Sequence, residues 1–216
     1  MVLIIDTETT GLRGIPEDRV LEIGIAEYDE DSGNITPVYS EMIRYEDIVE
    51  FDSKYVNIDG SRGIWIYRNS DMRMEDTLNA RKDLETVVKE VQEIVSGKEV
   101  TSYNVGFDFD KYLDLEPWSL KDIAARKMDI MELATAKVYE LADSDSIEDK
   151  GLQERILMER ENSRHSGKWV RSEDAYRVLC TDNLEKMSSK QKHRALDDAL
   201  REAFILKHCA TLSTNN

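Results

Sequence analysis

The 216-residue sequence is poor in cysteine and contains no long apolar run. Its two cysteines, Cys180 and Cys209, have no CxxC spacing, so we expect neither a zinc site nor a disulfide framework. Two buried or semi-buried thiols in a reducing compartment are the favoured interpretation. No stretch of about 18 apolar residues occurs, so we expect no membrane span and no membrane partner. The first residues lack a basic segment, and Asp6 interrupts their apolar run, which predicts no signal peptide and a cytoplasmic protein.

Basic residues are also scarce, because 29 Lys and Arg stand against 45 Asp and Glu, for a formal net charge of −16. General nucleic-acid binders usually carry a basic patch or stripe, so this balance predicts weak non-specific binding to long duplexes. Several motifs of other chemistries are missing as well. The sequence has no Gly-rich phosphate loop ending in Lys-Ser/Thr, no GxGxxG, no HExxH and no GxSxG.

What remains is the composition of a globular protein, with 40% apolar and 34% charged residues. A chain of this length can bury one sizeable core, and we expect a single domain over residues 1–216. Residues 143–172 are markedly polar and are interpreted as an insertion, with a short helix at Leu152–Glu161 inside a charged loop.

Apolar periodicity predicts a β-meander followed by helices and one more strand. The segment at 64–67 is either a short strand or a packing plug. A meander followed by a helix and a strand indicates an α/β sheet of mixed direction. The expected strands are Val2–Ile5, Arg19–Tyr28, Ile35–Arg44 and Glu99–Tyr103, and the expected helical segments are Met74–Val95 and Pro117–Ala142.

The run IIDTETTGL at residues 4–12 is the first candidate for chemistry. Asp6 and Glu8 would project from the same face of a strand, roughly 7 Å apart along it. Two adjacent carboxylates repel each other, and a divalent cation such as Mg²⁺ or Mn²⁺ relieves that repulsion through hard oxygen ligands. The alternative is a strand end that runs into a polar turn, with both acids solvated.

Residues 102–113, SYNVGFDFDKYL, form a second candidate where a strand gives way to a helix. Two acids compete for a functional role there, Asp108 and Asp110. An acid at a helix N-terminus can also act simply by favouring the helix dipole.

Residues 193–199, HRALDDA, form a third candidate. If His193 were already helical, Asp197 at i+4 would share its face and Asp198 at i+5 would lie well round the helix. Asp198 is the better candidate if His193 lies on the loop that enters the helix. His193 is the residue type that accepts a proton near neutral pH, and a water nucleophile needs a base. His165 and His208 are interpreted as structural or solvated.

Together the three segments resemble the motifs of the DEDD exonuclease superfamily in its histidine-bearing subgroup. Relatives include the proofreading subunit of bacterial replicative polymerases, RNase T and oligoribonuclease. The resemblance runs from Val2 to about Leu206 and implies an RNase H-like fold, a mixed central sheet flanked by helices. The family pattern Asn-x-x-Phe-Asp matches Asn104, Phe107 and Asp108.

The family pattern His-x-x-x-x-Asp selects Asp198 over Asp197. The resemblance then implies that two Mg²⁺ or Mn²⁺ ions are held by four carboxylates, while His193 takes a proton from water. Further residues are expected to meet the substrate. The implied metal ligands are Asp6, Glu8, Asp108 and Asp198, and the implied substrate-binding residues are Thr9, Thr10, Leu12, Asn104 and Phe107.

The implied activity is hydrolysis of phosphodiester bonds from a 3′ end to release nucleoside 5′-monophosphates. Single-stranded DNA is the favoured substrate, and an exoribonuclease of the RNase T or oligoribonuclease type is the alternative. A catalytically silent nucleic-acid-binding or polymerase-associated scaffold is a further alternative, which the retained acids argue against. The basic residues of the polar segment, among them Arg164, Lys168 and Arg171, are expected to steer a strand. The sequence does not identify a protein partner.

Overall fold

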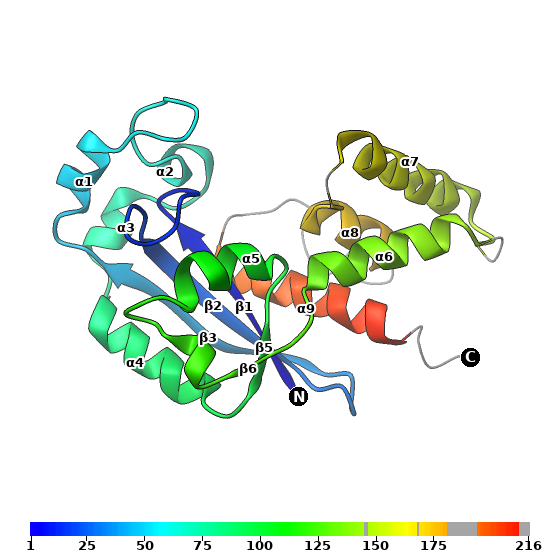
Figure 1. Cartoon of the computed structure of the whole chain (residues 1–216), viewed down its shortest axis with the longest axis horizontal. Helices are drawn as coiled ribbons and strands as arrows, with labels where there is room; N and C mark the ends of the chain where they lie inside the picture. The colour runs from blue at the N-terminus through cyan, green and yellow to red at the C-terminus, as the bar shows by residue number, and fades with distance from the viewer. Residues whose placement is uncertain (145–146, 168, 181–193, 212–216) are drawn as a thin grey trace.

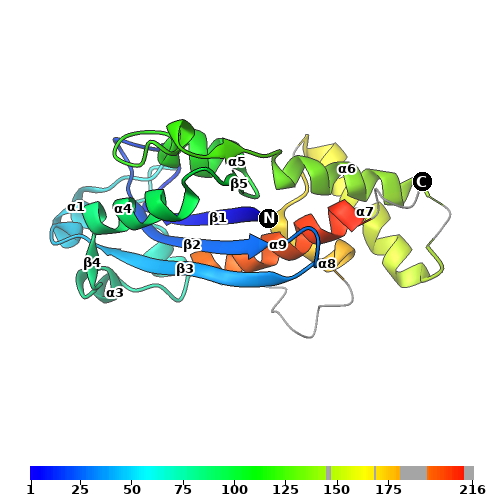
Figure 2. The same cartoon turned by 90° about the horizontal axis from the view of Figure 1, so that it is seen from below.

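A computed structural model describes residues 1–144, 147–167, 169–180 and 194–211 of the chain (Figure 1). Within these residues a six-stranded sheet has the strand order β4-β3-β2-β1-β5-β6. Helices cover both of its faces, with α4 and α9 on opposite sides (Figure 2). The predicted α/β fold with a mixed sheet is therefore confirmed.

The first three strands form the predicted meander: β1 (Val2–Thr9), β2 (Val20–Tyr28) and β3 (Ile35–Arg44) pair antiparallel in chain order. Strand β1 continues beyond the predicted end at Ile5, because its backbone pairs with β2 as far as Thr9. Three short strands then pair parallel to their neighbours, which makes the sheet mixed. These are β4 (Lys82–Asp83) beside β3, β5 (Glu99–Thr101) beside β1, and β6 (Ala125–Arg126) beside β5.

The alternation of side chains along β1 decides which helix each residue faces. Leu3 and Ile5 join a buried cluster with helix α4 (Leu84–Val95). Ile4 joins a second cluster, on the other face, with α6 (Ile130–Ala142) and α9 (Ala195–Thr211). Because Asp6 and Glu8 follow Ile4 at a spacing of two, their side chains leave the sheet on the α9 side.

The prediction of one helical segment over Met74–Val95 is wrong in its first half. The structure has α3 (Met74–Leu78), then β4, then α4. Asp83 takes an extended backbone and its carboxylate accepts a hydrogen bond from the Thr86 N–H, which caps a new helix at Leu84. The predicted end at Val95 is correct, and Gly97 follows with a φ of 69°.

The helical prediction for Pro117–Ala142 holds only for its second half, α6. A 3₁₀ turn, η2 (Leu120–Asp122), and strand β6 precede it. Asp129 marks the boundary, because its carboxylate accepts hydrogen bonds from the Met131 and Val105 N–H groups and so caps α6. Strand β5 also ends at Thr101, two residues before the predicted Tyr103.

Two helices occupy the segment that follows β3, α1 (Ile48–Lys54) and α2 (Ile66–Asn69). The packing plug predicted at 64–67 is the correct alternative to a strand, because Ile64 and Ile66 are buried in a small apolar cluster with Ile48.

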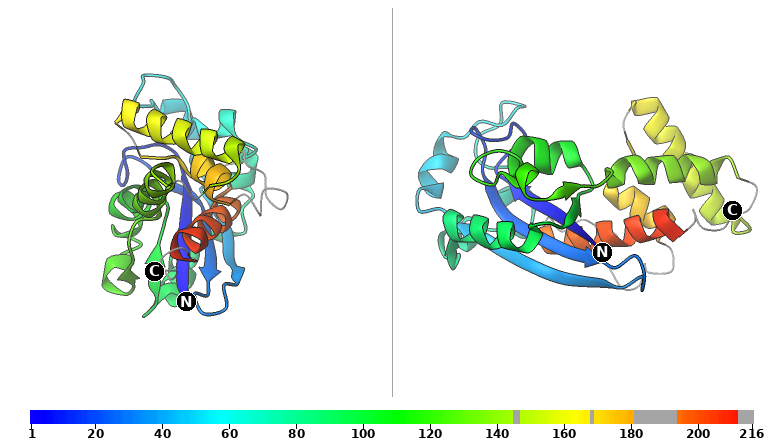
Figure 3. Two further views of the ribbon diagram at one scale, coloured as in Figure 1. Left: turned by 90° about the vertical axis from the view of Figure 1, so that its right-hand side faces the viewer. Right: turned by 60° about the horizontal axis from the view of Figure 1, so that its bottom comes forward.

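The polar segment 143–172 is far more helical than predicted. Its helix α7 spans Lys150–Ser166, and α8 (Ser172–Leu179) begins at its end. Asp149 caps α7 by accepting hydrogen bonds from two backbone N–H groups, and Gly167 ends it with a φ of 62°. Helices α6, α7 and α8 lie together to one side of the sheet (Figure 3). No helix among the described residues has the length and apolar character needed to cross a membrane.

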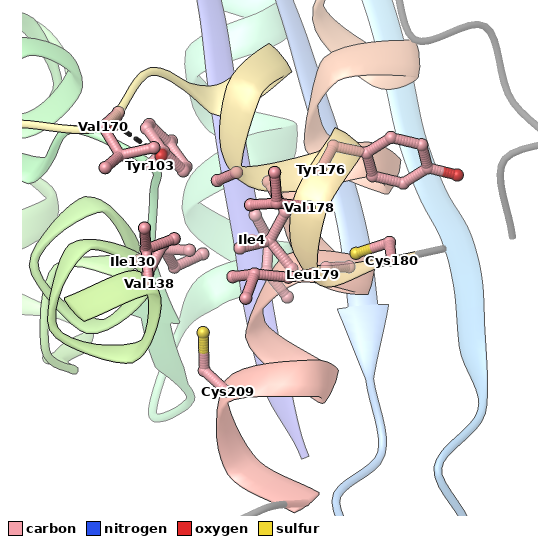
Figure 4. Close-up of a cluster of buried hydrophobic side chains, with 14 of the residues drawn as sticks. Ile4, Tyr103, Ile130, Val138, Val170, Tyr176, Val178, Leu179, Cys180 and Cys209 are labelled. Carbon is pink, nitrogen blue, oxygen red and sulfur yellow. Dashed lines mark hydrogen bonds between the residues drawn. The ribbon is translucent and has the colours of Figure 1, made fainter. Parts of the chain in front are cut away.

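Both cysteines are buried free thiols, as predicted. They flank the apolar cluster that joins α6, α8 and α9 to β1 (Figure 4). Burial raises the pKa of both thiols.

Candidate active site

Three carboxylates from the first and third motifs converge where β1 meets α9. One oxygen each from Asp6, Glu8 and Asp198 lies within 4.8 Å of the others. Glu8 and Asp198 are buried and Asp6 is partly buried. Asp197 is not a member of this group, so the structure brings Asp198 and not its neighbour to the first motif.

The beginning of α9 is fixed against β2 by a carboxylate and a glycine. Glu22, opposite Glu8 in the sheet, accepts hydrogen bonds from the Arg194 side chain at 2.7–3.1 Å and from the Ala195 N–H at 3.1 Å. Gly24 lies directly beneath the helix, and a Cβ there would come within 2.2 Å of the Ala195 carbonyl carbon and the Leu196 nitrogen. The Glu22 hydrogen bonds and the close packing on Gly24 together fix the position of Asp198 relative to β1.

Asp108 reaches the same site from α5 (Val105–Asp108), which continues into the π-helical turn η1 (Phe109–Leu113). One of its oxygens accepts hydrogen bonds from the Thr7 N–H at 3.1 Å and from the Thr7 hydroxyl at 2.7 Å. Burial raises the pKa of Asp108 to about 7, although the Thr7 hydrogen bonds oppose the rise. Its competitor Asp110 is exposed.

The other two residues of the second motif lie at the same turn. The Asn104 side chain accepts a hydrogen bond from the Phe107 N–H at 3.1 Å and thereby caps α5. Phe107 packs edge-to-face against Tyr112, with ring centroids 5.4 Å apart. Both motif residues line the cleft described below.

Glu202 is an acidic residue of the site that the motifs did not indicate. It lies one helical turn after Asp198 on α9, is almost fully buried, and accepts a hydrogen bond from the Tyr103 N–H at 3.2 Å. Its spacing of four residues from Asp198 places both side chains on the same helix face. That spacing is the sequence signal that could have identified it.

The acids raise one another's proton affinity. Burial is the main cause of the raised pKa of Asp6, and the negative charges of Glu202 and Asp108 add to it. Burial and Asp198 likewise raise the pKa of Glu8. Burial and Asp108 also raise the pKa of Glu202. Arg201 forms a buried ion pair with Asp198, but the site still carries a marked excess of negative charge. Oxygen ligands at this spacing suit a hard divalent cation.

All of these acids except Asp198, which is fully buried, line a cleft of about 770 Å³ at the carboxyl end of β1. All five residues predicted to bind substrate line it, together with Asp6, Glu8, Asp108 and Glu202. One wall comes from the segment between α1 and α2, including Ile58 and Trp65. The other comes from α6 and the start of α8, including Met131 and Arg171.

Asp18 shapes the loop that follows β1 and carries Thr9, Thr10 and Leu12. Its buried carboxylate accepts hydrogen bonds from the Tyr55 hydroxyl at 2.5 Å and from the Arg13 N–H at 2.5 Å. Thr10 is fully buried and also bonds to this loop, whereas Leu12 projects into solvent. Of the substrate-binding candidates, Leu12 is therefore more accessible than Thr10. His193 lies outside the described residues.

Comparison with known structures places the fold among 3′-exonucleases. A full-length 3′-exonuclease superimposes with a TM-score of 0.55 at 13% identity, over 98% of this chain and 60% of that one. The zinc-bound form of the E. coli exonuclease I complex with single-stranded DNA gives 0.61 at 14%, over 97% and 40%. The nuclease domain of 3′hExo, a DEDDh family member bound to rAMP, gives 0.50 at 14%, over 99% and 92%.

This likeness is one of fold. The chain spans 60% of the full-length 3′-exonuclease and 40% of exonuclease I. No protein-family model matches the sequence, and no curated protein matches it significantly. The RNase H-like fold expected from the sequence agrees with these neighbours.

Proposed function

We propose that the chain is a metal-dependent 3′–5′ exonuclease of the DEDD superfamily, in its histidine-bearing subgroup. The observation that carries the proposal is the convergence of Asp6, Glu8 and Asp198 within 4.8 Å, in a fold shared with 3′-exonucleases. Asp108 lies in the same cleft and completes a set of four motif carboxylates. Clustered, buried acids destabilise a fold, so their retention is best explained by a catalytic role.

The donor set fits two divalent cations such as Mg²⁺ or Mn²⁺, with Asp6, Glu8, Asp108 and Asp198 as the proposed ligands. Two bound cations would activate a water molecule and neutralise the charge that develops on the leaving 3′-oxygen. The Thr7 hydrogen bonds orient the Asp108 carboxylate, which is proposed as a ligand. The Glu22 contacts at the start of α9 keep Asp198 facing β1.

The remaining proposed roles follow from the motif residues. His193 is the proposed base that takes the proton of the attacking water. The end of β1 and the loop after it are proposed to hold the terminal nucleotide, with the backbone around Thr9 and Thr10 meeting the nucleotide and Leu12 against its base. The exposed position of Leu12 at the cleft suits contact with a base.

Single-stranded DNA is the proposed substrate, and RNA is the alternative. The cleft of about 770 Å³ is lined by Asp6, Glu8 and Asp108, so a single strand bound in it would meet three of the proposed ligands. A net charge of −16 also disfavours long-range attraction to duplex DNA. The proposed products are nucleoside 5′-monophosphates.

The test is digestion of 5′-labelled single-stranded DNA, duplex DNA and RNA with Mg²⁺ or Mn²⁺, and after chelation. We expect hydrolysis of a single strand that begins at its 3′ end, stops on chelation and is slowed by a 3′-phosphate. Undiminished hydrolysis after thorough chelation contradicts the metal-dependent proposal. Equal rates on blocked and free 3′ ends, or products that are internal fragments, indicate an endonuclease instead.

A further inference from the structure

Trp65 presents a large apolar surface on one wall of the cleft although its neighbours in the chain are buried. Ile64 and Ile66 on either side of it are 0% and 4% exposed, whereas Trp65 is 45% exposed. The Trp65 carbonyl accepts hydrogen bonds from the Asn69 side chain at 2.8 Å and from the Arg68 N–H at 3.1 Å. The backbone is therefore fixed at a place where the indole faces the cleft.

Ile58, on the same wall, is 66% exposed. An exposed aromatic ring with an aliphatic neighbour is costly to keep in water, and contiguous exposed apolar surface commonly marks a binding site. The same cleft is lined by Asp6, Glu8 and Asp108, so a ligand that carries both an apolar ring and an acidic group would match the exposed apolar side chains and the proposed cations.

A cation is fixed on the other wall of the cleft. The Val170 carbonyl accepts a hydrogen bond from the Tyr103 hydroxyl at 2.7 Å (Figure 4), and the Val170 N–H donates to the Thr135 hydroxyl at 3.0 Å. The next residue, Arg171, is held by Asp174 at 2.9 Å while its side chain stays 79% exposed. Helix α2, which begins directly after Trp65, and helix α8, which begins directly after Arg171, lie on different sides of α5 (Figure 1).

We propose that Trp65 and Arg171 form a subsite for an unpaired nucleotide upstream of the 3′ terminus, with the base stacked on the indole and a phosphate at the guanidinium. The inference rests on the proposed exonuclease function, which assigns the terminal nucleotide to the loop after β1. Every base has a π-face, so such a site accepts any sequence, but it requires a base that is not paired. Arg171 supplies a planar cation for the phosphate.

The first experiment measures the binding of a fluorescent single-stranded oligonucleotide in Ca²⁺, with the integrity of the strand checked after each titration. Trp65→Ala should weaken binding about tenfold, the scale of one base–aromatic stack, and Trp65→Phe should recover most of the loss. The matched control is Trp169→Ala, because Trp169 is 51% exposed but does not line the cleft. Wild-type affinity in Trp65→Ala overturns the subsite.

An abasic scan then tests stacking itself. A single abasic residue is moved through the positions upstream of the 3′ nucleotide. At one position it should weaken binding to the wild type as much as Trp65→Ala does, and the two changes together should cost no more than either alone. If the two losses multiply at every position, Trp65 contacts no base and the proposal is wrong.

The phosphate contact is tested by salt dependence. Arg171→Gln should lower the slope of log affinity against log salt by about 0.7, the value for one phosphate contact on a single strand. Arg81→Gln is the control, since Arg81 is exposed, lies outside the polar segment and does not line the cleft. An unchanged slope in Arg171→Gln removes Arg171 from the subsite.

Failure of this inference and failure of the function are distinguishable. If the wild type hydrolyses the strand and Trp65→Ala binds it with unaltered affinity, the subsite is contradicted and the proposed exonuclease activity is not. Binding that depends on Trp65, without hydrolysis of any strand, supports the subsite and sinks the exonuclease. A wild type that binds no single strand contradicts both.

Discussion

Asp108 shows most clearly that burying a carboxylate in this site makes its ionised form unfavourable. Its raised pKa of about 7 means that the folded protein binds a proton more tightly than the unfolded chain does. The stability from this group is therefore fully present below the unfolded pKa of about 3.9 and is lost as pH rises through about 7. At pH 8 the ionised group opposes folding unless a cation is bound.

Asp108→Asn should accordingly stabilise the metal-free protein at pH 8, because the amide oxygen still accepts from Thr7 but carries no charge. Relative to the wild type, the gain should shrink by about 2 kcal/mol between pH 7 and pH 5, because the Asp108 carboxyl is half protonated at pH 7 and a full pH unit is worth about 1.4 kcal/mol. Urea unfolding in chelator across this pH range measures it. A gain that is constant or grows toward low pH contradicts the assigned direction of the pKa.

Glu202 performs a second task besides adding charge, since it bonds to the Tyr103 N–H at the start of the second motif. Glu202→Gln retains an oxygen acceptor, whereas Glu202→Ala leaves the N–H buried without it. We expect the alanine variant to be less stable than the glutamine variant by about 1–3 kcal/mol. Equal stability of the two in urea would mean that the bond contributes nothing.

The packing of the first turn of α9 on Gly24 of β2 links the third motif to the first. Gly24 has no room for a Cβ, which would meet the backbone of Ala195 and Leu196 at 2.2 Å. Gly24→Ala should push the first turn of α9 away from the sheet and displace Asp198 from Asp6 and Glu8. We expect a lower melting temperature and at least a tenfold weaker affinity for Mn²⁺, measured by calorimetry.

A suitable control for Gly24→Ala is Gly60→Ala. Gly60 has a positive φ of 83°, so its substitution brings backbone strain, but nothing lies within 4 Å of a Cβ there. Both variants should lose some stability, while only Gly24→Ala should lose Mn²⁺ affinity. Equal Mn²⁺ affinities in the two variants would contradict the proposed role of the packing of α9 on Gly24.

The sequence predicts the elements whose signal is local and strong. Alternating apolar residues identify β1, β2 and β3, and the strand spacing of Asp6 and Glu8 gives their shared face. The apolar pattern does not reveal the break between Leu78 and Leu84, where the Asp83 carboxylate caps the start of a second helix. The sequence predicts too short a helix for α7, because Asp149 and Gly167, which cap it, lie in a stretch with many other charged residues.

The residues of the site likewise fall into those that the sequence motifs indicate and those that only the tertiary structure reveals. Motif spacing supplies Asp6, Glu8, Asp108 and Asp198, and the structure brings three of these within 4.8 Å. The contribution of Glu202 depends on a contact between α9 and the turn after β5, segments about 100 residues apart. The walls of the cleft also depend on tertiary packing, so the sequence does not single out Trp65 and indicates Arg171 only as one of several basic residues of the polar segment.

For the molecule as a whole, the buried acids make the fold sensitive to cations. Ions that bind only the folded state stabilise it by mass action, about 2.7 kcal/mol at a concentration of 100 times the dissociation constant. Mg²⁺ or Mn²⁺ should therefore raise the melting temperature, whereas NaCl at equal ionic strength should not do so to the same extent. Asp6→Asn should reduce the shift, and a wild-type melting temperature unmoved by either ion contradicts a preformed site.

The measurement that tests the proposed exonuclease most directly compares two neighbouring aspartates on α9. Wild type, Asp197→Asn and Asp198→Asn are incubated with a 5′-labelled single strand in Mn²⁺, and the products are separated by length. The wild type and Asp197→Asn should shorten the strand one nucleotide at a time from the 3′ end, and Asp198→Asn should leave it intact. Shortening by Asp198→Asn at the wild-type rate, or no Mn²⁺-dependent shortening by the wild type, would contradict the proposed active site.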